Sequence, residues 1–269
     1  MKQKTKNIFH QEQTKRIYIK GKIHDVSVGM KEIQLQNGQK FITYDTLGPY
    51  GDADFKHDIK HSFHPMPIKT YIAQNEERIL KELFSLIRIP SISALPKRKD
   101  DMVRCAKRWK ELLLEAGVDR AEIMPSAGNP LVYAEKMIPG ATKTVLIYSH
   151  YDVMPAEPLE LWHSNPFEPE VRDGKIFARG ADDDKGQAMI QVKAFEYLVT
   201  HDLLRHNVKF IFEGEEEIGS PSLGDFLQDH KELLKADIIL VSDTSMLSAE
   251  LPSLTTGLRG LAYWQVEVT

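Results

Sequence analysis

Four short motifs concentrate side chains that could bind metal ions. They read SHYDVMPA at 149–156, RGADDDKG at 179–186, EGEEEIGS at 213–220 and VSDTS at 241–245. Carboxylates and imidazoles are the ligands that zinc and similar divalent metals accept, at roughly 2.0–2.2 Å. The glutamate-rich motif directly follows the mostly apolar run 208–212. A shell of metal ligands would explain why so many carboxylates stand at the end of a buried strand.

The elements that must position these motifs alternate between strand and helix. Strand patterns occur at 131–135, 144–149, 208–212 and 237–241, with helical patterns at about 185–200 and after Gly219. This alternation predicts an α/β fold with a mostly parallel sheet and helices on both faces. In such sheets ligands bind at the C-terminal ends of the strands. We therefore expect the four motifs, which we place at these strand ends, to converge on one crevice.

The chain before this sheet has two parts of different character. Helical periodicity runs from residue 68 towards Pro90 and again over about 100–116, ending at Gly117. Residues 1–65 instead predict a small β-rich segment, with strand-like pieces at 16–19, 33–35 and 41–44. Within it His57, His61 and His64 suggest either a metal site or a polar linker. The linker is favoured, because no Cys or Glu stands at ligand spacing.

Composition excludes several classes of function. The chain has 269 residues, 42% apolar and 28% charged, with a formal net charge of −4. That balance argues against a nucleic-acid surface, and no apolar run approaches the length of a membrane span. A single cysteine, Cys105, suits a reducing compartment. We therefore predict a soluble cytoplasmic protein without nucleic-acid or membrane partners.

Electrostatics makes metal ions the natural complement of the crevice. The four motifs supply ten carboxylate and imidazole groups, which would repel one another without cations. Two divalent ions about 3.5–4 Å apart can share a carboxylate and a water, and so activate that water. An unligated glutamate would then accept the proton. The doublet Glu216-Glu217 could supply both the base and a ligand, in an order that spacing alone leaves open.

In order and spacing, the motifs resemble the metallopeptidase family that includes carnosine dipeptidase, acetylornithine deacetylase, succinyl-diaminopimelate desuccinylase and carboxypeptidase G. The resemblance covers about Met66 to Thr269. It implies two divalent metal ions, of which zinc is the preferred element and manganese and cobalt are the alternatives. It also implies these roles: metal ligation by His150, Asp183 (bridging), Glu217 and Asp243, and catalytic roles for Asp152, which orients the imidazole, and Glu216, the general base.

The resemblance also implies a substrate. In this family an aspartate at position 243 is typical of dipeptidase-like and aminopeptidase-like members, and a glutamate of carboxypeptidase-like members and deacylases. The stretches 162–186 and 254–268 also look most like the carnosine-dipeptidase branch. We expect a hydrolase of dipeptides. The alternatives are a deacylase of N-acyl amino acids on the same metal site and a non-catalytic fragment that binds metal.

The two ends of the chain depart from this pattern. The resemblance implies a further histidine ligand beyond residue 269 and a lid domain that starts at 261–269, and the pattern at 261–268 predicts a strand there. We therefore expect a truncated catalytic domain at 66–260 with weak activity or none, and a homodimer only through the absent lid. Residues 16–63 resemble the N-terminal region of phosphomethylpyrimidine synthase without its cluster cysteines. This predicts a gene fusion or an annotation error, not a second activity.

Several residues of the motifs also have plain structural explanations. An aspartate at a helix start caps the helix, so Asp182 or Asp184 is expected to cap the helix at 185–200. Capping would explain only one of the three consecutive aspartates at 182–184. Asp183 therefore keeps its expected role as a metal ligand. We assign no chemistry to Glu213 or Glu215, and a structural role to Lys185.

Overall fold

The computed structural model divides the chain into two compact units, Met1–His64 and Pro65–Thr269. It describes the backbone of 13–19, 22–34 and 40–47, the whole of 66–244, and residues 246, 248, 253, 255, 257, 260, 262 and 264–267. In the first unit three strands form an antiparallel sheet in the order β1-β2-β3, namely β1 (Gln13–Ile19), β2 (Lys22–Gln34) and β3 (Lys40–Leu47). The β-rich segment is thus confirmed. The three histidines at 57, 61 and 64 lie outside the described residues.

The second unit is built on a five-stranded sheet in the order β10-β6-β9-β5-β4. Its strands are β4 (Arg120–Met124), β5 (Leu131–Lys136), β6 (Thr144–His150), β9 (Asn207–Glu213) and β10 (Ile238–Val241). Strand β6 pairs in parallel with β10 and β9, whereas β5 is antiparallel to both of its neighbours. All strands except β5 therefore point the same way, which confirms the mostly parallel sheet.

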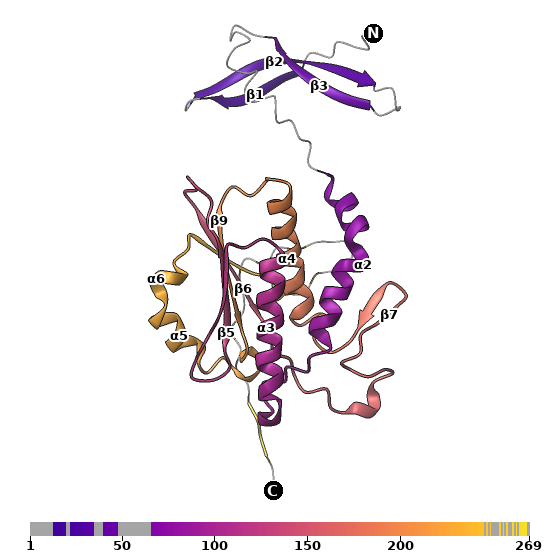
Figure 1. Ribbon diagram of the computed structural model, residues 1–269, viewed down its shortest axis with the longest axis vertical. Helices are drawn as coiled ribbons and strands as arrows, with labels where there is room; N and C mark the ends of the chain where they lie inside the picture. Colours follow the sequence, from indigo (N-terminus) through magenta and orange to yellow (C-terminus); the bar gives the residue numbers. More distant parts are fainter. Residues whose placement is uncertain are drawn as a thin grey trace. The chain divides into compact units, whose positions relative to one another are not determined.

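Helices cover both faces of this sheet (Figure 1). On one face lie α2 (Ile68–Ile87), α3 (Lys99–Glu115) and α4 (Lys185–Thr200), close to the bounds that the sequence predicts. On the other lie the short helices α5 (Leu223–Asp229) and α6 (Lys231–Leu234). A small hairpin, β7 (Glu170–Arg172) with β8 (Lys175–Phe177), stands apart from the main sheet.

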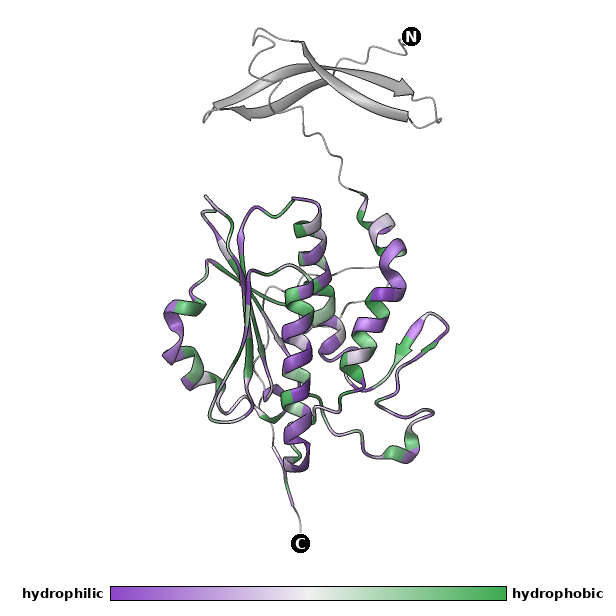
Figure 2. Ribbon diagram, in the orientation of Figure 1, coloured by the Kyte–Doolittle hydropathy of each residue, from purple (hydrophilic) through white to green (hydrophobic). Residues whose placement is uncertain are grey.

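Alternation along the strands builds a core on each side of the sheet. In β5, Val132 and Ala134 pack with the α2, α3 and α4 layer, whereas Leu131 and Tyr133 pack towards α5 and α6. Successive side chains of a strand point to opposite faces, so one strand serves both cores. In Figure 2 hydrophobic and hydrophilic residues alternate along the helices.

Two features differ from the sequence prediction or add to it. Strand β4 was not predicted, and it joins β5 through the short connection 125–130, which suits an antiparallel pair. The predicted strand at 261–268 is wrong for residues 262 and 264–267, which have no regular structure. A strand needs a hydrogen-bonding neighbour, and no described strand pairs with these residues.

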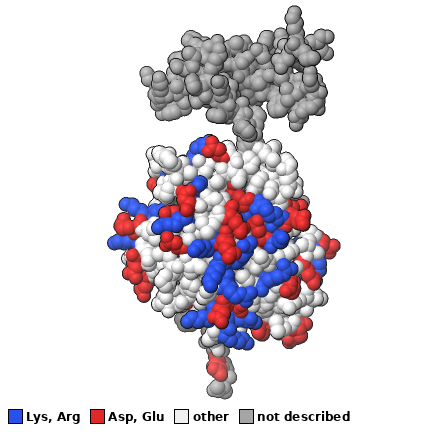
Figure 3. Space-filling view, viewed as in Figure 1, with Lys and Arg blue, Asp and Glu red and all other residues white. Residues whose placement is uncertain are grey.

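The second unit also shows how charged side chains are distributed and whether a helix could span a membrane. Figure 3 shows basic and acidic side chains interspersed on the face that α3 covers. Among the described residues, no helix combines the length and the apolar character needed to cross a bilayer.

Trp109 tests the larger core. The side chain is fully buried, and its ring meets Phe212 edge to face with the centroids 4.9 Å apart. Trp109→Ala should lower the free energy of unfolding by about 3–5 kcal/mol, because it leaves a cavity. Leu114, exposed on the same helix, is the control, and Leu114→Ala should cost less than about 1 kcal/mol. Urea unfolding followed by circular dichroism measures both; equal effects would contradict this core.

Candidate metal centre

The ends of three neighbouring strands bring the motifs together. Strands β6 and β9 end side by side, with His150 paired in register with Glu213. On the other side of β6, Val241 of β10 pairs with Tyr148, so Asp243 follows two residues past that strand end. Three motifs follow strand ends of this sheet as predicted. The prediction is wrong for the motif at 179–186, which lies between the hairpin strand β8 and α4, although its Asp183 still lies 3.0 Å from the His150 imidazole.

The imidazole of His150 lies at the centre of this edge and is fully buried. Its Nε2 is 3.0 Å from Asp183 Oδ1, 3.4 Å from Asp243 Oδ2 and 3.8 Å from Glu216 Oε2. Its Nδ1 lies 3.1 Å from the backbone carbonyl oxygen of Asp152 and 3.3 Å from the Oδ1 of the same residue. One ring nitrogen thus faces carboxylates from three segments of the chain, and the other is held from behind.

Asp152 holds two loops in register. Its buried carboxylate accepts the backbone N–H of Glu216 at Oδ1 and that of Glu217 at Oδ2, both at 3.1 Å. These two glutamates begin a 3-10 turn, Glu216–Ile218, immediately after β9. Oδ1 of Asp152 therefore lies beside both the imidazole and the glutamate turn. This arrangement orients the imidazole, as expected for this aspartate, and also presents the Glu216-Glu217 doublet.

The doublet is less buried than the imidazole. The Glu216 side chain is 41% exposed. Glu217 Oε1 accepts the backbone N–H of Met154 at 3.1 Å, which holds it over the loop that follows β6. Neighbouring glutamates on a tight turn thus have different surroundings, as a base and a ligand would require.

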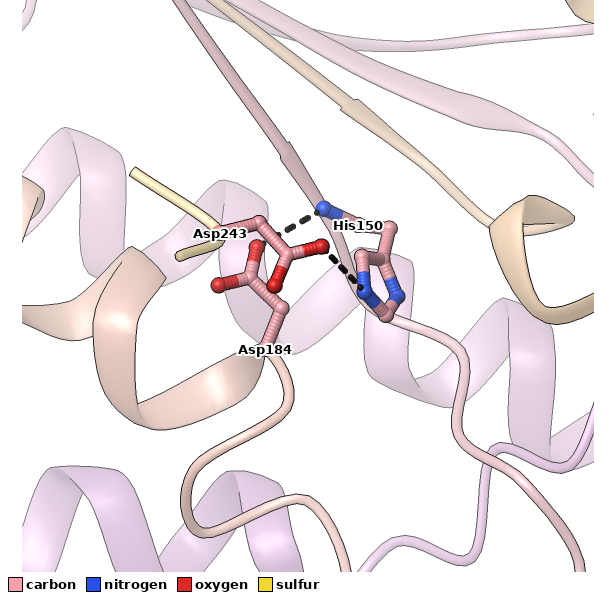
Figure 4. Close-up of side chains that lie close together, drawn as sticks. All are labelled: His150, Asp184 and Asp243. Atoms are coloured by element: carbon pink, nitrogen blue, oxygen red, sulfur yellow. Dashed lines mark hydrogen bonds and ion pairs between the residues drawn. The ribbon is translucent and has the colours of Figure 1, made fainter. Parts of the chain in front are cut away.

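Asp184 is the residue that sequence reasoning misjudged. It occupies the N-cap position of α4, but its carboxylate makes no capping hydrogen bond there. Instead its Oδ2 accepts the backbone N–H of His150 at 3.1 Å, and its buried Oδ1 has no partner among the described residues. The expected capping by Asp184 is therefore wrong, because the side chain turns inward to the strand end. Ligand atoms of His150, Asp184 and Asp243 all lie within 4.8 Å of one another (Figure 4).

The carboxyl pKa values of this cluster are raised first by burial and then by neighbouring negative charge. Burial, followed by the charge of Asp183, raises the pKa of Glu217 to about 7. Burial likewise raises the pKa of Asp184 to about 7 and that of Asp243 above its ordinary value. Burial alone would lower the pKa of His150, yet the hydrogen bond and charge of Asp152 prevail and raise it to about 10.

These features fit a divalent cation. The donor set combines one imidazole with several carboxylates, which matches borderline metals. An orphaned buried carboxylate oxygen and raised carboxyl pKa values both signal negative charge that lacks a positive neighbour. A metal ion would supply that neighbour without a proton.

The remaining charged residues of the motifs are structural. Glu213 accepts hydrogen bonds from Tyr148 and Ser220, and Glu215 accepts the backbone N–H groups of Asn129 and Ser222. Lys185 is fully buried, and its Nζ donates to the backbone carbonyl oxygens of Leu86 and Ile89 at 3.0 and 2.8 Å. The absence of a predicted chemical role for these three residues agrees with these contacts. The contact of Glu215 with Asn129 has no local signal in the sequence, because the two residues are 86 positions apart.

Replacing Asp152 tests the support behind the ligands. Asp152→Asn should weaken zinc binding by about 10–100-fold, because the charge that orients the imidazole and the glutamate turn is lost. Asp182→Asn is the matched control, since this exposed aspartate precedes Asp183 directly. It should change the affinity by less than about threefold. Calorimetric titration with zinc measures both, and equal affinities for the two variants would refute the role of Asp152.

The raised pKa values predict a steep pH dependence of metal binding. With a pKa of about 10 for His150 and about 7 for Glu217, the metal-free site holds one proton at pH 8 and more at pH 6. Since each displaced proton costs about tenfold in affinity per pH unit, zinc should bind at least about 100-fold more weakly at pH 6 than at pH 8. Calorimetry in two buffers with different ionisation heats counts the released protons; a pH-independent affinity would contradict this charge state.

The chain is similar to two known protein families, one for each of its two parts. Residues 146–265 match Peptidase family M20/M25/M40, and residues 10–76 match the ThiC-associated domain. The chain is 33% identical to the cysteinylglycine-S-conjugate dipeptidase of Corynebacterium striatum over 198 residues, covering 73% of this chain and 44% of that protein.

Two solved structures share the fold of the second unit. One is an M20 family metallo-carboxypeptidase from Sulfolobus solfataricus, with 38% identity, a TM-score of 0.59, and 64% of this chain and 38% of that chain covered. The other is human carnosine dipeptidase 1, with 27% identity and a TM-score of 0.61. The match covers 66% of this chain and 41% of that chain. The chain spans less than half the length of these relatives. Both resemblances drawn from the motifs are thereby confirmed: from about residue 66 onward the chain is related to the M20 peptidases and their dipeptidase branch, and its N-terminal part to the ThiC-associated domain.

Proposed function

We propose that residues 66–269 carry the catalytic site of a metal-dependent hydrolase that cleaves dipeptides in the cytoplasm. One observation carries the proposal: His150 Nε2 faces carboxylates from three segments, while Asp152 holds the opposite ring nitrogen. Ligands preorganised by a buried carboxylate behind the imidazole are typical of catalytic metal sites. The name of the Corynebacterium relative, a dipeptidase, agrees with this chemistry.

The first proposed ligand set follows the contacts of the imidazole, and the second follows the resemblance to the metallopeptidases. His150, Asp183 and Asp243 would hold one ion, and Asp183 with Glu217 would hold the second. Zinc suits this donor set best, with manganese and cobalt as alternatives. When bound, the ions would acidify a water molecule and polarise the carbonyl of the scissile peptide bond.

Glu216 would transfer the proton of the water molecule during hydrolysis. Glu216 is free for this work, because its Oε2 is 3.8 Å from the imidazole and its side chain is 41% exposed. Burial raises the pKa of Glu216 above its ordinary value, with the charges of Asp243 and Asp152 adding to the effect. A carboxylate with a raised pKa is a better acceptor of a water proton near neutral pH. Glu216 would take that proton and deliver it to the departing amine.

The preferred substrate is proposed to be a dipeptide with a free amino end. Asp243 supports this choice, because the resemblance associates aspartate at this position with dipeptidases and aminopeptidases. An N-acyl amino acid would use the same ions and the same base, so only the turnover of the two substrate types separates the hypotheses.

Glu216 provides the decisive test. The zinc-loaded chain is assayed for release of amino acids from Cys-Gly, β-Ala-His and N-acetyl amino acids. Glu216→Gln should lower kcat by about 10²–10⁴-fold without weakening zinc binding, because the base is removed and the ligands stay. Glu160→Gln, an exposed glutamate in the loop after β6, is the control and should retain full activity.

Three outcomes would overturn parts of this proposal. We expect only weak hydrolysis from this chain, and its complete absence from the zinc-loaded wild type would assign the chain the alternative role of a non-catalytic fragment that binds metal. Equal turnover by wild type and Glu216→Gln would reject the base. Faster turnover of the N-acetyl amino acids than of the dipeptides would replace the dipeptidase by the deacylase.

A further inference from the structure

A cavity of about 410 Å³ lies outside the metal centre. It opens between the segment 92–98, which links α2 to α3, and the segment 156–167 of the loop that precedes β7 in Figure 1. Its walls are apolar at Ile92, Leu95 and Phe167, and Lys97 and Arg98 add two positive charges. Its volume falls within the range of about 300–1,000 Å³ that is usual for small-molecule sites.

The charge around the cavity is positive on balance. Glu157 is the acidic residue among its lining residues, against the two basic ones. Arg98 Nη1 contacts Asp101 Oδ2 at 3.0 Å, but Arg104 Nη1 contacts the other oxygen of the same carboxylate at 2.6 Å. Asp101 therefore shares one negative charge between two guanidinium groups, and Arg98 keeps part of its positive charge for a ligand.

Two lining residues also have buried donors without acceptors. Arg98 Nε and Ser164 Oγ are inaccessible to solvent and make no hydrogen bond within the described part of the chain. A buried donor that lacks an acceptor is destabilising. A solvent-inaccessible atom cannot touch a ligand in the cavity, so an anion there would rely instead on Lys97, which is exposed, and on the Arg98 guanidinium, whose side chain is 37% exposed.

We propose that this cavity binds a small organic carboxylate that carries an apolar group, such as an acylated hydrophobic amino acid. The carboxylate would lie against Lys97 and Arg98, with charge-assisted hydrogen bonds from the Lys97 ammonium and from the Arg98 nitrogen that Asp101 leaves free. The apolar group would pack against the wall that Ile92, Leu95 and Phe167 form. Inorganic phosphate shares the charge but has no group for that wall, so it should bind more weakly.

The cavity is separate from the metal centre but lies on the same loop. Ser91 Oγ donates to the carbonyl oxygen of Tyr151 at 2.7 Å, and the Val153 N–H donates to the carbonyl oxygen of Ser91 at 2.9 Å. These bonds flank Asp152, whereas Ala156, further along, lines the cavity. The inference therefore stands without the proposed hydrolase activity.

The experiment measures binding of N-acetyl-L-leucine to the full chain by calorimetry, with N-acetyl-L-leucinamide and inorganic phosphate as comparison probes. The acid should bind at least about tenfold more tightly than the neutral amide, because charge-assisted hydrogen bonds are lost in the amide. It should also bind more tightly than phosphate. Equal binding of acid and amide would overturn the proposal, and tighter binding of phosphate would overturn the choice of a carboxylate with an apolar group.

Two lysines close in sequence provide a matched pair of variants. Lys97→Gln should weaken binding of the acid about threefold, and Lys97→Gln with Arg98→Gln about tenfold or more. Lys99→Gln should leave binding unchanged, because Lys99 does not line the cavity. Both lysines are exposed, so these single variants should keep the wild-type melting temperature. Wild-type affinity in the double variant would overturn the proposal.

A variant in the metal centre, Glu217→Gln, distinguishes binding of N-acetyl-L-leucine in the cavity from binding at the metal centre. Unchanged binding of the acid in Glu217→Gln, together with weakened binding in Lys97→Gln, supports the separate cavity. Weakened binding in Glu217→Gln with unchanged binding in Lys97→Gln would place the probe at the metal centre and overturn the inference.

Discussion

The fully buried carboxylate of Asp152 is the interaction on which the metal centre depends. It reaches the imidazole on the end of β6 and the two backbone N–H groups of the turn after β9. An ionised carboxylate without such partners would be costly to bury. Because each of its two oxygens accepts one of these N–H groups, Asp152 ties the loop after β6 to the turn after β9.

Opposite this support, Asp183, Asp243 and Glu216 lie within 3.0–3.8 Å of the other ring nitrogen. In the protein alone these charges are relieved by protons. Burial and the charge of Asp183 raise the pKa of Glu217, and Asp152 raises the pKa of His150 against the effect of burial. A divalent ion would relieve these charges more completely, since it carries two charges and needs several oxygens around it. Fold stability and metal affinity are therefore coupled through the same few side chains.

The sequence predicts the site better than the sheet that carries it. The strand ends and the motifs after them are local patterns, so His150, Asp183 and Asp243 could be placed together before any coordinates. The reversed direction of β5 depends on its pairing with β9, far along the chain, and no local pattern encodes it. The inward turn of Asp184 has the same origin, because its partner is the backbone of another strand. The cavity beside Lys97 is also invisible in the sequence, since it forms between two loops.

The contrast between Asp183 and Asp184 follows from the same physics. The Asp184 carboxylate is buried, and its Oδ2 accepts the backbone N–H of His150. Only its Oδ1 has no hydrogen-bond partner among the described residues. The Asp183 side chain is 58% exposed, and its Oδ1 lies 3.0 Å from the nitrogen that would face a metal. A carboxylate that bridges two ions needs both oxygens, which favours Asp183 for that role. Asp184 is better suited to hold the strand end and to add negative charge beneath the ions, because its position is already fixed by a backbone hydrogen bond.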